Sequence, residues 1–235
     1  MKYIGIVLFI FMCSNLVFAQ HEKREDDIFF KKHLVRSMDL HEPANAEIFG
    51  SEQTMLHVLL DAYCAGQLQG YKDARLTQSL TYDEFEERLK LFLPEDDLQE
   101  PWHVVHTVEI GENLIFSKHT SDFYFSMETF TLFIPADKSY RGLQEPLISF
   151  KYNQCAKVFS ASKEAVSVNP IKNGRDINYA DLFLLRCFNS TVVKIGNSRD
   201  LYFDQVHTEK LSAFLASKAG ENELTEYIFK LYNPD

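Results

Sequence analysis

One aromatic stretch decides the fold class of this 235-residue chain: Phe123-Tyr124-Phe125-Ser126-Met127-Glu128-Thr129-Phe130-Thr131-Leu132-Phe133-Ile134. Its aromatic and β-branched residues favour a β-strand, which Pro135 ends. The neighbouring segments have a similar composition, and we predict further strands at 102–110, 113–117, 146–152 and 157–159, with a break at Gly111 and a turn over 137–142. Strands that follow one another in this way predict an antiparallel sheet in the middle of the chain.

The segments before this sheet have a helical period instead. Apolar residues recur at helical spacing over 26–40 and over 53–68, which predicts two helices. A short extended piece is expected over 76–80. Thr81-Tyr82-Asp83-Glu84 then forms a capping box that starts a third helix, because the hydroxyl and the carboxylate can each bond the other residue's free backbone amide.

The C-terminal third returns to helix. A helix is predicted over 178–189, a strand over 191–195, and two last helices over 207–219 and 221–232, separated by Gly220. Helices, then strands, then helices around one strand indicate the α+β class rather than a doubly wound sheet. We therefore expect a helical N-terminal third, a central antiparallel β-sheet, and C-terminal helices with one further strand.

Residues 1–19 have the features of a secretory signal peptide: Lys2, an apolar run over 4–11, and a small-residue cleavage site at Val17-Phe18-Ala19. We expect cleavage there, which leaves an exported chain over 20–235 that folds as a single domain. Loss of Lys2 leaves 23 basic and 34 acidic residues, a net charge of 23 − 34 = −11. Such an acidic surface repels nucleic acids and anionic membranes, and it suits contact with basic protein partners.

The cysteines give no sign of a disulfide framework. Cleavage leaves Cys64, Cys155 and Cys187, an odd number without CxxC spacing. One disulfide bridge plus one buried thiol is an alternative arrangement, but we expect folding not to depend on a disulfide. Cys64 and Cys187 are predicted on the apolar sides of helices, where a thiol is unreactive.

The histidines suggest no metal site. His103 and His106 lie in a valine-rich segment that we predict as a strand, where an odd separation puts two side chains on opposite faces. The sequence also lacks a GxSxG elbow, a phosphate-binding glycine loop and a calcium loop. We expect no metal, no cofactor and no catalytic residues.

Three segments resemble, in order and spacing, motifs of the GldN/PorN family. The first is Arg24-Glu25-Asp26-Asp27-Ile28, followed by Lys31, Arg36 and Met38-Asp39-Leu40. The second runs from Leu56-His57-Val58-Leu59-Leu60-Asp61 to Thr81-Tyr82-Asp83-Glu84-Phe85. The third is Asn178-Tyr179-Ala180-Asp181-Leu182-Phe183 with Arg186 and Phe188, ending at Ser190-Thr191-Val192-Val193-Lys194. The chain departs from the family pattern at two places. Glu112-Asn113-Leu114 is a reduced form of the family's acidic-aromatic cluster, and Leu185 replaces an aromatic residue. These departures indicate a divergent member.

The resemblance implies a non-enzymatic periplasmic component of gliding motility and type IX protein secretion. Members of that family form a ring with an outer-membrane lipoprotein and meet the periplasmic shaft of an inner-membrane motor. On this expectation the protein is periplasmic and is held at the outer membrane through its partner. The charged side of the predicted first helix supplies three candidates for the partner contact, Arg24, Lys31 and Arg36.

Two other classes of function stay open. An exported hydrolase would assemble its site from dispersed acids and histidines, and a binding protein for a small apolar ligand would account for 20 Phe and 11 Tyr. A deep pocket with converging ionisable groups would favour the enzyme. A closed aromatic core with a flat, semi-apolar outer face would favour the ring component.

Overall fold

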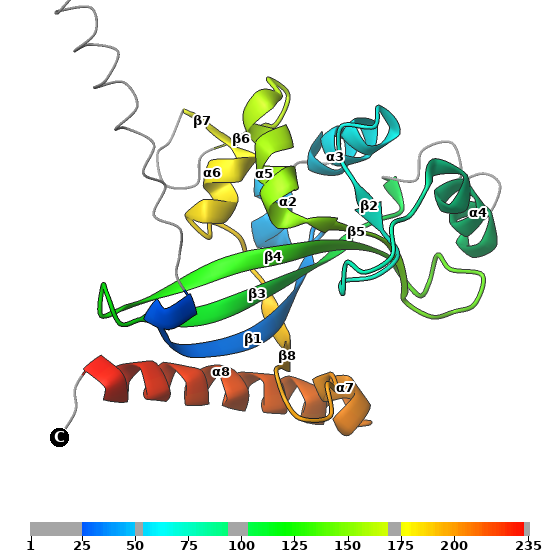
Figure 1. Ribbon diagram of the computed structural model, residues 1–235. Helices are drawn as coiled ribbons and strands as arrows, with labels where there is room; N and C mark the ends of the chain where they lie inside the picture. Colours follow the sequence, from blue (N-terminus) through cyan, green and yellow to red (C-terminus); the bar gives the residue numbers. More distant parts are fainter. Residues whose placement is uncertain (1–24, 50–53, 94–102, 169–174, 233–235) are drawn as a thin grey trace, which may run out of the picture.

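The predicted sheet is the centre of the computed structural model, which describes residues 25–49, 54–93, 103–168 and 175–232 (Figure 1). Its strands are β1 (Ile28–Asp39), β2 (Gly70–Tyr71), β3 (Thr107–Ser117), β4 (Asp122–Ile134), β5 (Glu145–Lys151) and β8 (Thr191–Ile195). They pair in the order β2-β5-β4-β3-β1-β8, and every neighbouring pair is antiparallel. The α+β class and the central antiparallel sheet are therefore confirmed.

Most of the helices gather on one side of this sheet in Figure 1. They are α2 (Pro43–Phe49), α3 (Thr54–Cys64), α5 (Tyr152–Ala161) and α6 (Tyr179–Leu184), with the short hairpin of β6 (Val166–Val168) and β7 (Asp176–Asn178) beside them. Helix α4 (Tyr82–Phe92) lies near β2 and β5, and α7 (Phe203–Val206) leads into the long α8 (Lys210–Tyr232) below β1 and β8. A 3-10 turn (Glu25–Asp27) precedes β1. No helix among the described residues has the length and apolarity needed to cross a bilayer.

The core between the sheet and the helices is aromatic, as the sequence predicts. Phe183 of α6 stacks on Phe49 with ring centroids 5.9 Å apart and meets Phe130 of β4 edge-on at 5.2 Å. Tyr179 lies 5.9 Å from Phe49 and 5.6 Å from Phe159. All five rings are fully buried, and each contributes roughly 1.5–3 kcal/mol relative to an exposed position.

The helix predicted over 26–40 is wrong, because this segment is strand β1. Leu34 and Met38 are buried and four residues apart, so they fit a helical face, but they also fit one face of a strand. Pairing decides between the two periods: β1 lies inside the sheet and bonds β3 along nearly its whole length and β8 over residues 34–37.

Four other boundaries also change. The strand predicted at 157–159 is part of helix α5, whose Cys155 and Phe159 are buried one turn apart. Gly111 lies within β3 instead of breaking it, beside a bulge in β4. The helix over 178–189 ends earlier, at Leu184. The two predicted C-terminal helices are one helix, α8, which continues through Gly220.

Several local predictions are confirmed. Helix α3 falls inside the predicted 53–68 segment, and strands β4, β5 and β8 match their predicted ranges closely. The capping box is complete: Thr81 Oγ1 accepts from the Glu84 amide, and Glu84 Oε2 accepts from the Thr81 amide at 3.0 Å. The expected signal peptide over 1–19 lies outside the described residues.

Candidate functional site

Two arginines from distant parts of the chain meet on one buried carboxylate. Arg36 of β1 donates from Nε to Oε1 of Glu112 at 2.6 Å. Arg186, which follows α6, donates to Glu112 from Nη1 to Oε2 at 2.6 Å and from Nη2 to Oε1 at 3.1 Å. The second pair is bidentate, which is the strongest arrangement of an arginine with a carboxylate. We call Arg36, Glu112 and Arg186 the arginine cluster.

Glu112 is buried inside the fold, and the two arginines reach it from nearer the surface. The side chain of Glu112 is 0% exposed, whereas those of Arg36 and Arg186 are 16% and 28% exposed. Glu112 follows the bulge in the β3–β4 pairing, and Arg186 adopts a left-handed backbone with φ 55° just after α6. A buried carboxylate without these cations would be strongly unfavourable, so the cluster fixes β3 against β1 and the α6–β8 loop.

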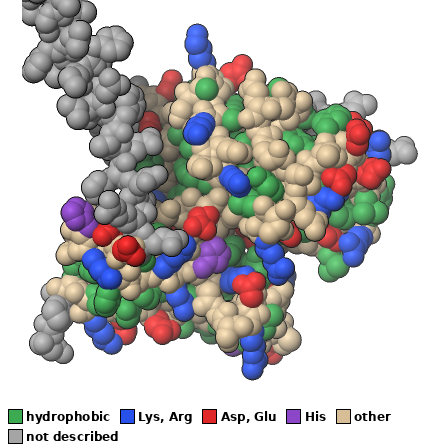
Figure 2. Space-filling model, in the orientation of Figure 1, with side chains coloured by type: hydrophobic (Ala, Val, Ile, Leu, Met, Phe, Trp, Pro, Cys, Tyr) green, Lys and Arg blue, Asp and Glu red, His purple; other side chains and the backbone are tan. Residues whose placement is uncertain are grey.

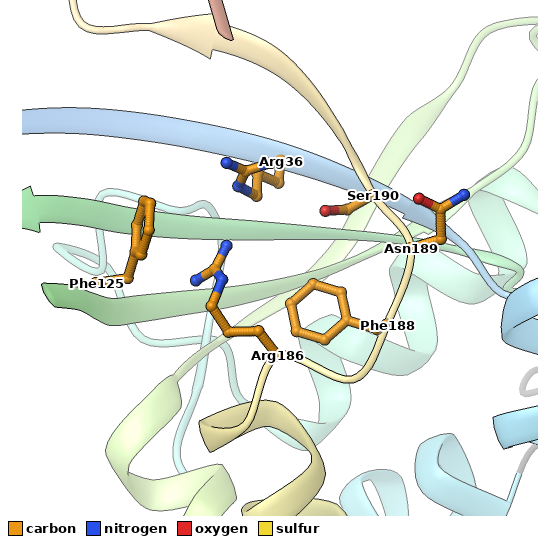
Figure 3. Close-up of a pocket in the computed structure, with 6 residues that line it drawn as sticks. All are labelled: Arg36, Phe125, Arg186, Phe188, Asn189 and Ser190. Carbon is orange, nitrogen blue, oxygen red and sulfur yellow. The ribbon is translucent and has the colours of Figure 1, made fainter. Parts of the chain in front are cut away.

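Aromatic rings frame the outer side of the cluster. Arg186 lies over the ring of Phe125 at 4.1 Å and near that of Phe188 at 5.7 Å, and Arg36 lies 5.8 Å from the Phe125 ring. Figure 3 shows both guanidinium groups projecting toward each other beside Phe125. Together with Asn189 and Ser190 these side chains line an open cavity of about 210 Å³.

This arrangement is suited to binding. A guanidinium carries more N–H donors than the bonds to Glu112 use, and its plane can stack on a ring. Helix α8 adds a second carboxylate, because Glu221 Oε1 accepts from Arg36 Nη1 at 3.4 Å. Charge-paired groups of this kind hold elements together or contact polar groups of another protein, and the cavity lining has no cysteine or histidine that would serve as a nucleophile or a base.

The three predicted contact residues have different positions. Arg24 lies outside the described residues. Lys31 of β1 is about half exposed, and its Nζ lies 3.7 Å from Oε1 of Glu128. Arg36 belongs to the arginine cluster. Because β1 is a strand, the five-residue separation puts Lys31 and Arg36 on opposite faces, so they do not lie on one charged face as we predicted.

Sequence reasoning missed the pairing of Glu112 with Arg186. Arg186 lies in the third segment that resembles the GldN/PorN motifs, whereas Glu112 lies where the chain departs from the family pattern, and 74 positions separate the two residues. The available signal was an acidic residue among strand-forming apolar residues, which needs a cationic partner when it is buried.

A second polar site lies in a cleft of about 950 Å³, lined by residues of β1, β3, β4 and β8 and by the segments around residues 73–75 and 200–205. The Tyr202 hydroxyl donates to Oε2 of Glu109 at 3.0 Å, and Lys194 Nζ pairs with Asp200 at 2.5 Å. Burial raises the pKa of Glu109 to about 7, with a smaller contribution in the same direction from Asp204. No pattern in the sequence predicted this cleft.

The cysteines do not lie where the sequence placed them. Cys64 is exposed and Cys187 is partly exposed, whereas Cys155 is the buried one, and all three are free. Burial raises the pKa of Cys155 far above its ordinary value, which keeps this thiol protonated. The prediction that Cys64 and Cys187 would be buried is wrong, because α3 turns Cys64 outward and Cys187 lies beyond the end of α6.

The histidine argument also needs correction. The predicted strand begins at Thr107, so His103 and His106 precede it, and the alternation of faces does not apply to them. His106 instead lies beside Asp39 and His41.

Comparison with protein-family models identifies the family. The family model described as "Gliding motility associated protein GldN" matches residues 23–233. No curated protein matches the chain.

Proposed function

The chain belongs to the GldN family of gliding-motility-associated proteins, and on that premise we propose that it is a non-enzymatic periplasmic subunit that forms a ring with an outer-membrane lipoprotein. Family membership places the protein in gliding motility and type IX secretion and implies protein partners. Our proposal adds that the protein forms a ring with an outer-membrane lipoprotein and is attached to the outer membrane through this lipoprotein. It also adds that the protein contacts the periplasmic shaft of an inner-membrane motor.

The observation that carries the proposal is the extent of the family match, from residue 23 to residue 233. The arginine cluster supports it, because its ion pairs and rings provide binding and bracing rather than chemistry. The face seen in Figure 2 also mixes acidic, basic and apolar side chains, without a large block of one charge. Mixed surfaces of this kind are common at contacts between proteins.

Lys31 is the residue with which to test the partner contact. Reversing Arg36 would leave the fully buried Glu112 short of a cation, and loss of one partner of a buried pair costs about 3–5 kcal/mol. An Arg36 variant would therefore confuse folding with binding. Lys31 is half exposed, and its ion pair with Glu128 is worth at most about 1 kcal/mol.

We expect Lys31→Glu to leave the melting temperature nearly unchanged and to reduce recovery of the outer-membrane lipoprotein from native envelopes. The measurement is pulldown of wild type and variant at equal concentration, with the partners identified by mass spectrometry. The substitution would replace the positive charge that the partner contacts with a negative charge, which would repel an acidic group of the partner.

Lys90→Glu is the matched control. Lys90 of α4 is also an exposed lysine, and its Nζ lies 3.8 Å from Oε2 of Glu86, so the same charge and the same kind of ion pair are lost on another element. Recovery should be normal with this variant. Equal loss with both variants, or loss with neither, would contradict a contact at Lys31.

The cleft around Glu109 favours one alternative, an exported hydrolase. A carboxyl group that keeps its proton near neutral pH is able to act as a general acid. If the purified protein finds no envelope partner and instead hydrolyses a small ester or peptide with activity that Glu109→Gln removes, the enzyme replaces the ring subunit.

A further inference from the structure

Three potential metal ligands meet where β1 ends and β3 begins. Asp39 is the last residue of β1, His41 lies in the turn before α2, and His106 directly precedes β3. One donor atom from each lies within 4.8 Å of the others. From this cluster we propose that Asp39, His41 and His106 bind a divalent transition-metal ion of the zinc type.

The backbone holds the three residues together. The amide of Leu40, between the first two, donates to the carbonyl oxygen of His106 at 2.8 Å, which continues the β1–β3 pairing. Oδ1 of Asp39 accepts from the His41 amide at 2.9 Å and lies 3.9 Å from Nδ1 of His106. The base of the site is therefore part of the sheet and does not depend on a long loop.

His106 has an unusual environment for a histidine. Its Nδ1 is buried and has no hydrogen-bond partner within the described part of the chain. A buried polar nitrogen without a partner is costly, and a bound cation would satisfy it.

The ligand set favours zinc-type ions over calcium or magnesium. Two imidazoles and one carboxylate are the donors of three-ligand zinc sites, in which water takes the fourth position, whereas calcium and magnesium prefer oxygen. Bonds of about 2.1 Å need donor atoms about 3.4 Å apart. The rings of His41 and His106 are stacked with centroids 4.8 Å apart, so the ring of His41 must turn, and this side chain is exposed and has room to do so.

The test is calorimetric titration of the metal-free purified protein with Zn²⁺, with Mg²⁺ as the negative probe. We expect one saturable Zn²⁺ site, and at a hundredfold excess over Kd a rise in melting temperature of about 5–10 °C. His106→Gln and Asp39→Asn should each weaken Zn²⁺ binding at least about tenfold. Asp39 is exposed, so its variant keeps the test valid even if His106→Gln folds poorly.

A second histidine–aspartate pair provides the matched control. His57 Nδ1 lies 2.9 Å from Oδ2 of Asp61 on α3, and both side chains are exposed. His57→Gln should leave Zn²⁺ binding unchanged. Absence of saturable binding to the wild-type protein, equal weakening by His57→Gln, or unchanged affinity in Asp39→Asn would overturn the proposal. None of these outcomes bears on the role in gliding motility, because the metal site does not depend on it.

Discussion

Two acidic residues three positions apart in β3, Glu109 and Glu112, have different surroundings. Glu112 is fully buried and forms ion pairs with two guanidinium groups. Glu109 lies in the polar cleft, where a tyrosine hydroxyl donates to it and burial raises its pKa from 4.5 to about 7. Glu112 therefore connects elements of the fold through its ion pairs, whereas Glu109 changes charge within the physiological range.

The protonation of Glu109 predicts a pH dependence of stability. Because its folded-state pKa is raised, its stabilising contribution is complete below pH 4.5 and is lost as the pH rises through 7. Glu109→Gln cannot ionise and keeps an oxygen for Tyr202. We expect it to be more stable than wild type at pH 8, by on the order of 2 kcal/mol, and nearly equal at pH 4.5. Urea unfolding of both proteins at the two pH values measures this, and a constant difference would contradict it.

At the scale of elements, α8 is held to the sheet along its length. Ser217 donates from Oγ to the carbonyl oxygen of Val192 at 2.6 Å, and the ring of Tyr227 lies 4.7 Å from that of Phe30. Near its end, the Tyr232 hydroxyl bonds Asp122 and accepts from the amide of Phe123 at 3.1 Å. These contacts reach from β8 to the β3–β4 hairpin, so the helix continues through Gly220, which would favour a break in isolation.

Gly220 allows the close approach of α8 to β8. A Cβ at this position would lie 2.6 Å from Cδ1 of Ile195 and 3.3 Å from Cζ of Phe203. We expect Gly220→Leu to lower the free energy of unfolding by about 1–3 kcal/mol, because the larger side chain overpacks this contact. Gly220→Ala is the control: the terminal methyl of Ile195 can move, and alanine gains up to about 1 kcal/mol of helix propensity. Chemical denaturation compares them, and leucine as stable as alanine would show that the contact is not tight.

The whole molecule is stabilised by its aromatic core and its sheet, without a cross-link between the described cysteines. Cys64, Cys155 and Cys187 are all free. The buried one, Cys155 of α5, belongs to the hydrophobic core. A chain of this size with one continuous core can bury enough apolar surface to fold without a disulfide.

We therefore expect reduction to leave the thermal stability of the protein unchanged. Melting temperatures with and without reductant should agree within a few degrees. Loss of a structural bridge commonly costs about 2–5 kcal/mol, which in a domain of this size would lower the melting temperature by roughly 5–20 °C. A decrease in that range would show that two of the thiols form a disulfide in the native protein.

The sequence alone was sufficient for features that depend on neighbouring residues. The strand over 123–134, the capping box at Thr81 and the aromatic core follow from residue type, spacing and amide capping within short windows. The α+β class follows from the order of the predicted helices and strands along the chain. The resemblance to the GldN family rests on linear motifs in the same way, and the family model confirms it.

Tertiary structure decided everything that depends on partners distant in sequence. Leu34 and Met38 satisfy both a helical and a strand period, and only β3 and β8 provide the backbone partners that make the segment a strand. Arg36 and Glu112 are 76 positions apart, and His106 reaches Asp39 only because β1 and β3 pair. Ion pairs and metal ligands require atoms within a few ångströms of one another in space. A local sequence pattern does not show which distant residues come that close.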